Sequence, residues 1–69
     1  MTQKELLYVE DAICHEDTII SNITDYINCL EDENLIDFMR KEENTHNKIK
    51  TDLYKLLESE SNEWQILFR

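Results

Sequence analysis

The sequence predicts an all-α protein, a helical hairpin whose two helices pack in antiparallel orientation. The chain contains no glycine and no proline, which disfavours tight glycine turns and the sheet-rich folds that depend on them. Apolar residues recur at heptad spacing in both halves of the chain. An acidic segment, Glu31–Asn34, separates the two halves and is suited to a tight turn.

The first helix is expected over about residues 3–31. Thr2 and Glu5 have the spacing of a capping box, in which each side chain accepts a hydrogen bond from the other residue's backbone N–H. The core stripe expected on this helix consists of Leu6, Val9, Ile13, Ile20, Ile23, Ile27 and Leu30. Glu16 stands in this stripe where another apolar residue belongs.

The second helix is expected over about residues 33–58, with Asp32 as its N-cap. Its expected stripe consists of Leu35, Met39, Ile49, Leu53 and Leu56, interrupted by Glu42 or Glu43 and by His46. The polar stretch Ser59–Asn62 predicts the end of the helix, and an apolar C-terminal segment, residues 62–69, follows. Within it, Trp64–Phe68 is expected to extend the helix, form a short third one, or join dimers into a higher homo-oligomer. All 69 residues form one domain.

Composition limits the function classes. A chain of 69 residues buries a small core, so a partner copy, a metal or both are expected. The net charge of -9 argues against nucleic acid and anionic membranes as partners. No stretch approaches the roughly 20 apolar residues of a membrane helix, and the polar N-terminal segment does not resemble a secretory signal, so the chain is expected to be cytoplasmic. Cys14 and Cys29 are too far apart on one helix for a disulfide and are expected to be free thiols.

The two interruptions of the stripes are expected to meet. If the chain reverses near Glu31, Glu16 lies opposite His46. Glu43 and Glu42 precede His46 by three and four residues, so both carboxylates lie on or beside the face that carries the imidazole. A carboxylate in a core must be paired, protonated or bound to a metal. The sequence therefore predicts one polar layer of candidate metal ligands.

Two hairpins related by a two-fold axis would make a four-helix bundle that contains every ligand twice. The result is a Glu from each of two helices and a Glu-x-x-His from each of the other two, the donor set of a di-metal carboxylate centre. Carboxylates with imidazole suit iron, manganese or zinc.

Each candidate ligand has a metal-free interpretation. Glu16 would form a salt bridge with Lys48 or Lys50 across the dimer, or it would hydrogen-bond to His46. Glu43 fits the Glu-x-x-His motif and is the favoured ligand, whereas Glu42 fits the expected heptad and is assigned an accessory role. His15 is adjacent to Glu16 in sequence but about 100° round the helix, which favours a solvent-facing position.

Residues 5 to 57 resemble the half-length members of the ferritin-like family, which include the encapsulated ferritin-like proteins and the spore coat F-like proteins of Firmicutes. The resemblance rests on ICHEDTII around Glu16, the acidic turn LEDENL, and EENTHNKI around Glu43 and His46. It implies that Glu16 is the first-helix ligand, Glu43 the bridging carboxylate and His46 the terminal ligand. The spacing from Glu16 to Glu43 is shorter than in typical ferritins, and a glycine-bearing shell-targeting tail is missing.

The activity that this resemblance implies is ferroxidase-type oxidation of Fe(II), for storage or detoxification of iron. Glu16, Glu43 and His46 would be the catalytic residues of a di-iron centre at a homodimer interface, with a shell or coat protein as a further partner. The alternative from a different class is a non-enzymatic helical assembly or coat component whose polar layer binds no metal.

Overall fold

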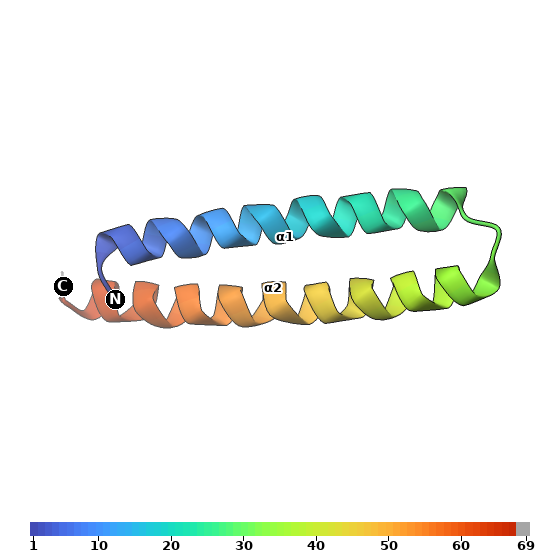
Figure 1. The fold of residues 1–69 in the computed structure, drawn as a ribbon. Helices are drawn as coiled ribbons and strands as arrows, with labels where there is room; N and C mark the ends of the chain where they lie inside the picture. The colour runs from blue at the N-terminus through green and yellow to red at the C-terminus, as the bar shows by residue number, and fades with distance from the viewer. Residues whose placement is uncertain (68–69) are drawn as a thin grey trace.

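The computed structural model describes the backbone of residues 1–67 and the side chains of residues 1–59. It consists of two antiparallel α-helices, α1 (Gln3–Cys29) and α2 (Glu33–Leu67), joined by a short turn (Figure 1). The hairpin is 55 Å long and 15 × 14 Å across. The predicted all-α helical hairpin is therefore confirmed. Neither helix contains, within the described residues, a stretch long and apolar enough to cross a membrane.

Local hydrogen bonds explain where α1 begins and ends. The backbone N–H of Thr2 donates to Glu5 Oε1 at 2.9 Å, and the backbone N–H of Glu5 donates to Thr2 Oγ1 at 3.1 Å. The predicted capping box is thus confirmed. The hydrogen bond that the Glu5 carboxylate accepts from the Thr2 backbone, followed by its interaction with the Thr2 side chain, lowers the pKa of Glu5 from its ordinary value of 4.5. The helix ends at Cys29. Its C-cap residue, Leu30, has an extended backbone, and the N–H of Leu30 still donates to the Tyr26 carbonyl.

The turn needs no glycine because Asp32 supplies the cap of α2. Its Oδ1 accepts hydrogen bonds from the backbone N–H groups of Asn34, at 2.8 Å, and Leu35, at 3.1 Å. Among the described residues, none has positive φ. An N-cap side chain and ordinary backbone angles are therefore enough to reverse the chain.

The end of α2 lies beyond the boundary expected near residue 58 and agrees with the first alternative for the C-terminal segment, an extension of the helix. The helix continues to Leu67 instead of ending near residue 58. Ser and Asn are only a few tenths of a kcal/mol poorer than average helix formers, and neither Gly nor Pro occurs in Ser59–Asn62 to stop the helix. Most of the expected C-terminal segment is thus an extension of α2. The question of whether Trp64–Phe68 joins dimers lies outside the described side chains.

The contact line between α1 and α2, which we call the seam, follows the predicted stripe on α1. The residues that are buried or half-buried along it are Leu6, Val9, Ile13, Glu16, Ile20, Ile23, Ile27 and Leu30. Among the described side chains only Ile13 and Ile23, at 6% and 7% exposure, are fully buried. The apolar core of one hairpin is therefore thin.

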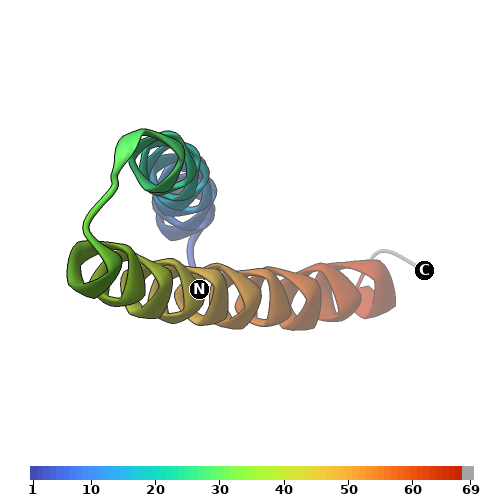
Figure 2. The ribbon, with the colours of Figure 1, turned by 90° about the vertical axis from the view of Figure 1, so that its right-hand side faces the viewer.

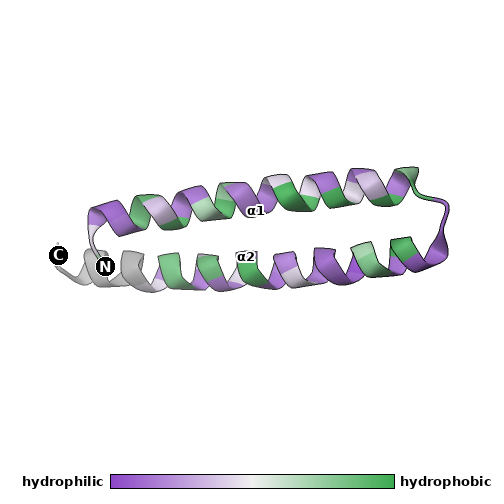
Figure 3. Ribbon diagram, viewed as in Figure 1, coloured by the Kyte–Doolittle hydropathy of each residue, from purple (hydrophilic) through white to green (hydrophobic). Residues whose placement is uncertain are grey.

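On α2 the predicted stripe is correct at Met39, His46 and Leu53 and wrong by one residue at Leu35, Ile49 and Leu56. The seam consists of Ile36, Met39, Glu43, His46, Lys50, Leu53 and Leu57. Leu35, Ile49 and Leu56, which were expected in the core, are instead 48%, 39% and 43% exposed. Two apolar stripes lie side by side on α2, and contact with α1 selects the other one. Figure 3 shows that the middle of α2 is hydrophilic and lies between apolar turns. Figure 2 shows the helix pair from the turn end; over residues 1–67, no other element covers either side of the pair.

Candidate metal centre

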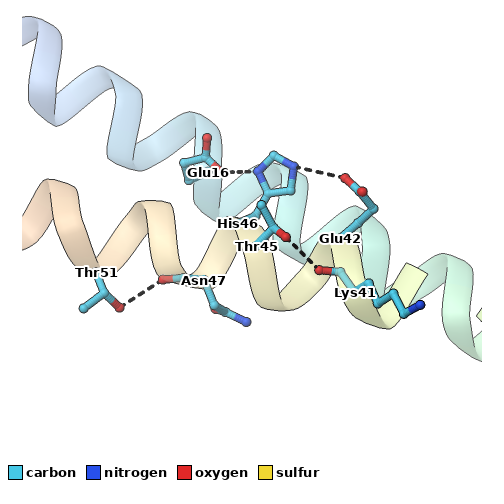
Figure 4. A network of polar contacts seen from close by, with 7 residues as sticks. All are labelled: Glu16, Lys41, Glu42, Thr45, His46, Asn47 and Thr51. Atoms are coloured by element: carbon cyan, nitrogen blue, oxygen red, sulfur yellow. Dashed lines mark hydrogen bonds and ion pairs between the residues drawn. The ribbon is translucent and has the colours of Figure 1, made fainter. Parts of the chain in front are cut away.

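The structure brings Glu16 and His46 together in the middle of the hairpin. His46 Nδ1 lies 2.5 Å from Glu16 Oε2, and the two side chains are only 22% and 15% exposed (Figure 4). Glu16 is the central residue of α1, Gln3–Cys29, and contacts a residue thirty positions later in the chain. The sequence predicted that these two residues lie opposite each other, because they are equally far from the turn, and the contact confirms it.

Glu42 lies on the other side of the same imidazole. His46 Nε2 is 3.9 Å from Glu42 Oε2, one helical turn away on α2 (Figure 4). In the tautomer of a neutral imidazole that donates from Nδ1 to Glu16, Nε2 carries the lone pair, on the side of Glu42. This arrangement orients the nitrogen that would bind a metal.

Glu43 lies on the seam but apart from the imidazole. Its Oε2 accepts a hydrogen bond from Thr24 Oγ1 of α1 at 3.1 Å. The same hydroxyl lies 3.0 Å from the Ile20 carbonyl. Within one chain, Glu42 and not the favoured Glu43 is the carboxylate of α2 beside His46. Sequence reasoning missed Thr24, because a threonine within a helix ordinarily bonds the carbonyl four residues back, as Thr18, Thr45 and Thr51 do here.

Lys50 follows His46 along the seam and forms an ion pair with Asp17. Its hydrogen bond to Asp17 raises the pKa of Lys50 above the ordinary 10.5. Within the chain, Glu16 therefore contacts His46 and Lys50 contacts Asp17. The expected alternative, in which Glu16 pairs with Lys50 or Lys48, concerned contacts across a dimer.

The residue types suit a hard or borderline divalent cation, since three half-buried carboxylates and one imidazole lie in the middle of the hairpin, with Glu16 and Glu42 beside His46 and Glu43 apart from it. In a single hairpin, however, the described residues contain no three His, Cys, Asp or Glu side chains arranged to hold a metal ion. One chain thus presents part of a ligand set, and a second chain would have to complete it.

The remaining candidate residues are separate from this layer. His15 is exposed on α1, where it lines a shallow surface hollow with Asp11, Cys14 and Thr18. Cys14 and Cys29 are exposed and are not joined in a disulfide, as the sequence predicted.

Comparisons with known proteins identify no relative. The chain matches no protein-family model, and neither the curated proteins nor the solved structures give a significant match.

Proposed function

We propose that this hairpin is half of a ferritin-like di-metal carboxylate protein, whose centre forms at the interface of a homodimer. Its activity would be oxidation of Fe(II), for storage or detoxification of iron. The observation that carries the proposal is the placement of His46 between Glu16 and Glu42. Glu43, the next residue of α2, lies on the seam and accepts a hydrogen bond from Thr24. A cytoplasmic location, free or inside a shell or coat, belongs to this proposal.

Each residue of the polar layer has a role in the proposed centre. His46 offers the lone pair of Nε2 while Glu16 holds its Nδ1–H, or Glu16 turns to bind metal itself. Glu42 and Glu43 supply the carboxylates of α2, and Glu43 would have to leave its hydrogen bond with Thr24 to do so. Iron, when bound, would supply the electrons that reduce dioxygen or peroxide; manganese or zinc would fit the same donors.

The charge of the layer supports a metal in the dimer. Two copies bring six carboxylates and two imidazoles into the middle of one bundle. Carboxylates at this density, half removed from water, repel one another unless cations or protons neutralise them. Divalent cations would remove this cost and at the same time link the two hairpins.

A second candidate function is supported by the contact between Glu16 and His46. At 2.5 Å it satisfies both polar groups without any metal. The polar layer would then fix the register of the helices in a non-enzymatic assembly or coat component, at some cost in stability.

The test is to measure iron content and native mass together on protein expressed with added iron. The variants are Glu16→Ala, Glu43→Ala and His46→Ala, and the matched control is Glu10→Ala, an exposed carboxylate on the same helix as Glu16. For the wild type we expect about two irons per dimer. Each variant of the polar layer should lose iron while Glu10→Ala retains it. A wild-type dimer without iron would instead favour the structural role.

A further inference from the structure

One side of the hairpin carries most of the exposed large apolar side chains described. Its members on α1 are Tyr8, Ala12, Ile19 and Tyr26, and its members on α2 are Leu35, Phe38, Ile49 and Leu56. Apart from Ala12, which is half-buried, these side chains are 36% to 60% exposed. They include the three residues that were expected in the core of the hairpin. We call this surface the apolar side.

Helix geometry places all eight residues on the same side of the pair. Each lies one residue before a seam residue, as Ile19 precedes Ile20 and Ile49 precedes Lys50. One residue corresponds to a rotation of about 100° about the helix axis. Because the two helices are antiparallel and both right-handed, this rotation turns both stripes toward the same side of the hairpin.

The opposite side has a different composition. The charged residues that follow a seam residue are Glu10, Asp17, Glu31, Asp37, Arg40 and Glu58. On the apolar side the charged residues at the equivalent positions are Glu5, Glu42 and Asp52. Half as many charged groups would therefore have to leave water if a second copy docked on the apolar side.

The exposed area agrees with what a dimer requires. Taking about 200 Å² for a fully exposed large side chain, the apolar side exposes on the order of 700 Å² of side-chain surface. A standard interface buries about 800 Å² on each partner. Since Ile13 and Ile23 are the only fully buried residues described, this area would enlarge a thin core.

We infer that the apolar side is the surface through which a second copy of this chain docks. A second copy offers matching stripes of the same length and the same heptad spacing. The polar layer lies at the centre of α1, so two-fold packing brings the two layers together whether the loops lie at the same end or at opposite ends. Each copy then places Glu42 in the middle of the interface. This last step rests on the proposed function; the docking surface does not.

The test is sedimentation of metal-free protein and of protein with Mn²⁺. Ile49→Asp and Leu56→Asp place a charge on the apolar side at residues that are not needed for the seam. The matched control is Leu7→Asp, because Leu7 is 57% exposed and follows seam residue Leu6, which puts it on the opposite side. We expect each apolar-side variant to raise the dimer dissociation constant at least about tenfold, since a charge would be buried, while Leu7→Asp changes it little. Circular dichroism checks that each variant stays helical.

A second variant tests whether the Glu42 carboxylate weakens the metal-free dimer. Glu42→Leu leaves Asp52 as the one charged residue of α2 among the described positions of the apolar side, and it removes two carboxylates from the middle of the interface. The metal-free dimer should tighten by about tenfold or more. Glu58→Leu, an exposed carboxylate on the opposite side, is the control.

The outcomes separate the docking surface from the metal centre. A wild-type monomer with and without Mn²⁺, or a dimer that Ile49→Asp and Leu56→Asp leave intact, overturns the inference. A dimer that both variants dissociate but that binds no metal supports the docking surface and removes the di-metal function. If the dimer binds metal and its dissociation constant is unchanged in Ile49→Asp and Leu56→Asp, the interface lies on another surface.

Discussion

At the scale of single residues, the contact between Glu16 and His46 is expected to reduce the stability of the hairpin while serving its function. The pair removes two polar groups from most of their water, and the 2.5 Å hydrogen bond only partly compensates for this. Apolar side chains would pack better at the same place. A polar pair in a thin core is therefore expected to be retained for binding or for register and to reduce stability.

Replacing both partners tests this trade-off. Glu16→Leu/His46→Leu is expected to stabilise the metal-free protein by about 1 kcal/mol or more, because two apolar side chains replace a polar pair at the seam. His46→Leu alone should be less stable than the double variant, since it leaves Glu16 half-buried without its partner. Thermal unfolding of the set checks this, and an unstable double variant would contradict it.

The capping box of α1 gives a prediction for stability. Thr2→Ala removes the oxygen that accepts the Glu5 N–H, and it should cost about 1 kcal/mol of unfolding free energy. Thr18→Ala is the control, because its hydroxyl only bonds the Cys14 carbonyl within the helix. Equal effects of the two changes would show that the cap contributes nothing particular.

The same cap should respond to pH. Because the pKa of Glu5 is lowered in the folded chain, its carboxylate contributes stability above its ordinary pKa of 4.5, and this contribution is lost as the pH falls through the lowered value. The difference in Tm between wild type and Glu5→Gln should therefore be present at neutral pH and vanish at strongly acidic pH. Glu10→Gln, beyond the first turn, provides the comparison. A difference that does not change with pH would contradict this role.

At the scale of the helices, the orientation of α2 decides which apolar stripe is buried. Leu57 lies at the seam and is half-buried, whereas its neighbour Leu56 is 43% exposed on the apolar side. The two stripes are similar in composition, and α1 contacts the one that contains Glu43 and His46. A rotation of α2 by one residue would exchange these roles.

Adjacent leucines test this orientation. Leu57→Ala is expected to lower the unfolding free energy by roughly 2 kcal/mol at every protein concentration, near the lower end for buried leucines, because Leu57 is only partly buried. Leu56→Ala should lower it only at concentrations where the dimer is populated. Chemical unfolding across a range of protein concentrations separates the two. The reverse pattern would mean that the rotation of α2 is the one first expected from the sequence.

At the scale of the whole molecule, net charge opposes association. Two copies of a chain with charge -9 repel each other, and salt screens this repulsion over about 10 Å at 0.1 M. The lysines of α2 that lie away from both the seam and the apolar side, Lys41, Lys48 and Lys55, are exposed and do not reduce the repulsion at the interface.

Dimerisation should therefore strengthen with monovalent salt. Raising NaCl from about 0.05 M to about 0.5 M is expected to lower the dissociation constant several-fold, because the apolar contacts remain while the repulsion is screened. Sedimentation of metal-free protein measures this. A dimer that weakens with salt would show that attractive ion pairs across the interface dominate instead.

The sequence alone determined the features that depend on neighbours along the chain. The helical hairpin follows from heptad spacing and from the absence of glycine and proline, and the caps at Thr2 and Asp32 follow from local hydrogen bonding. The meeting of Glu16 and His46 follows from equal distances to the turn. Helical hydrogen bonds are local, so short-range patterns are sufficient to predict them.

Only the tertiary structure decided how α2 is rotated about its axis. That rotation put Leu35, Ile49 and Leu56 on an exposed side, and it set Glu42 beside His46 while Glu43 contacts Thr24. On α2 two apolar stripes differ by one residue, so the sequence of that helix offers both orientations at similar cost. Packing against α1, a contact between residues far apart in the chain, selects one of them.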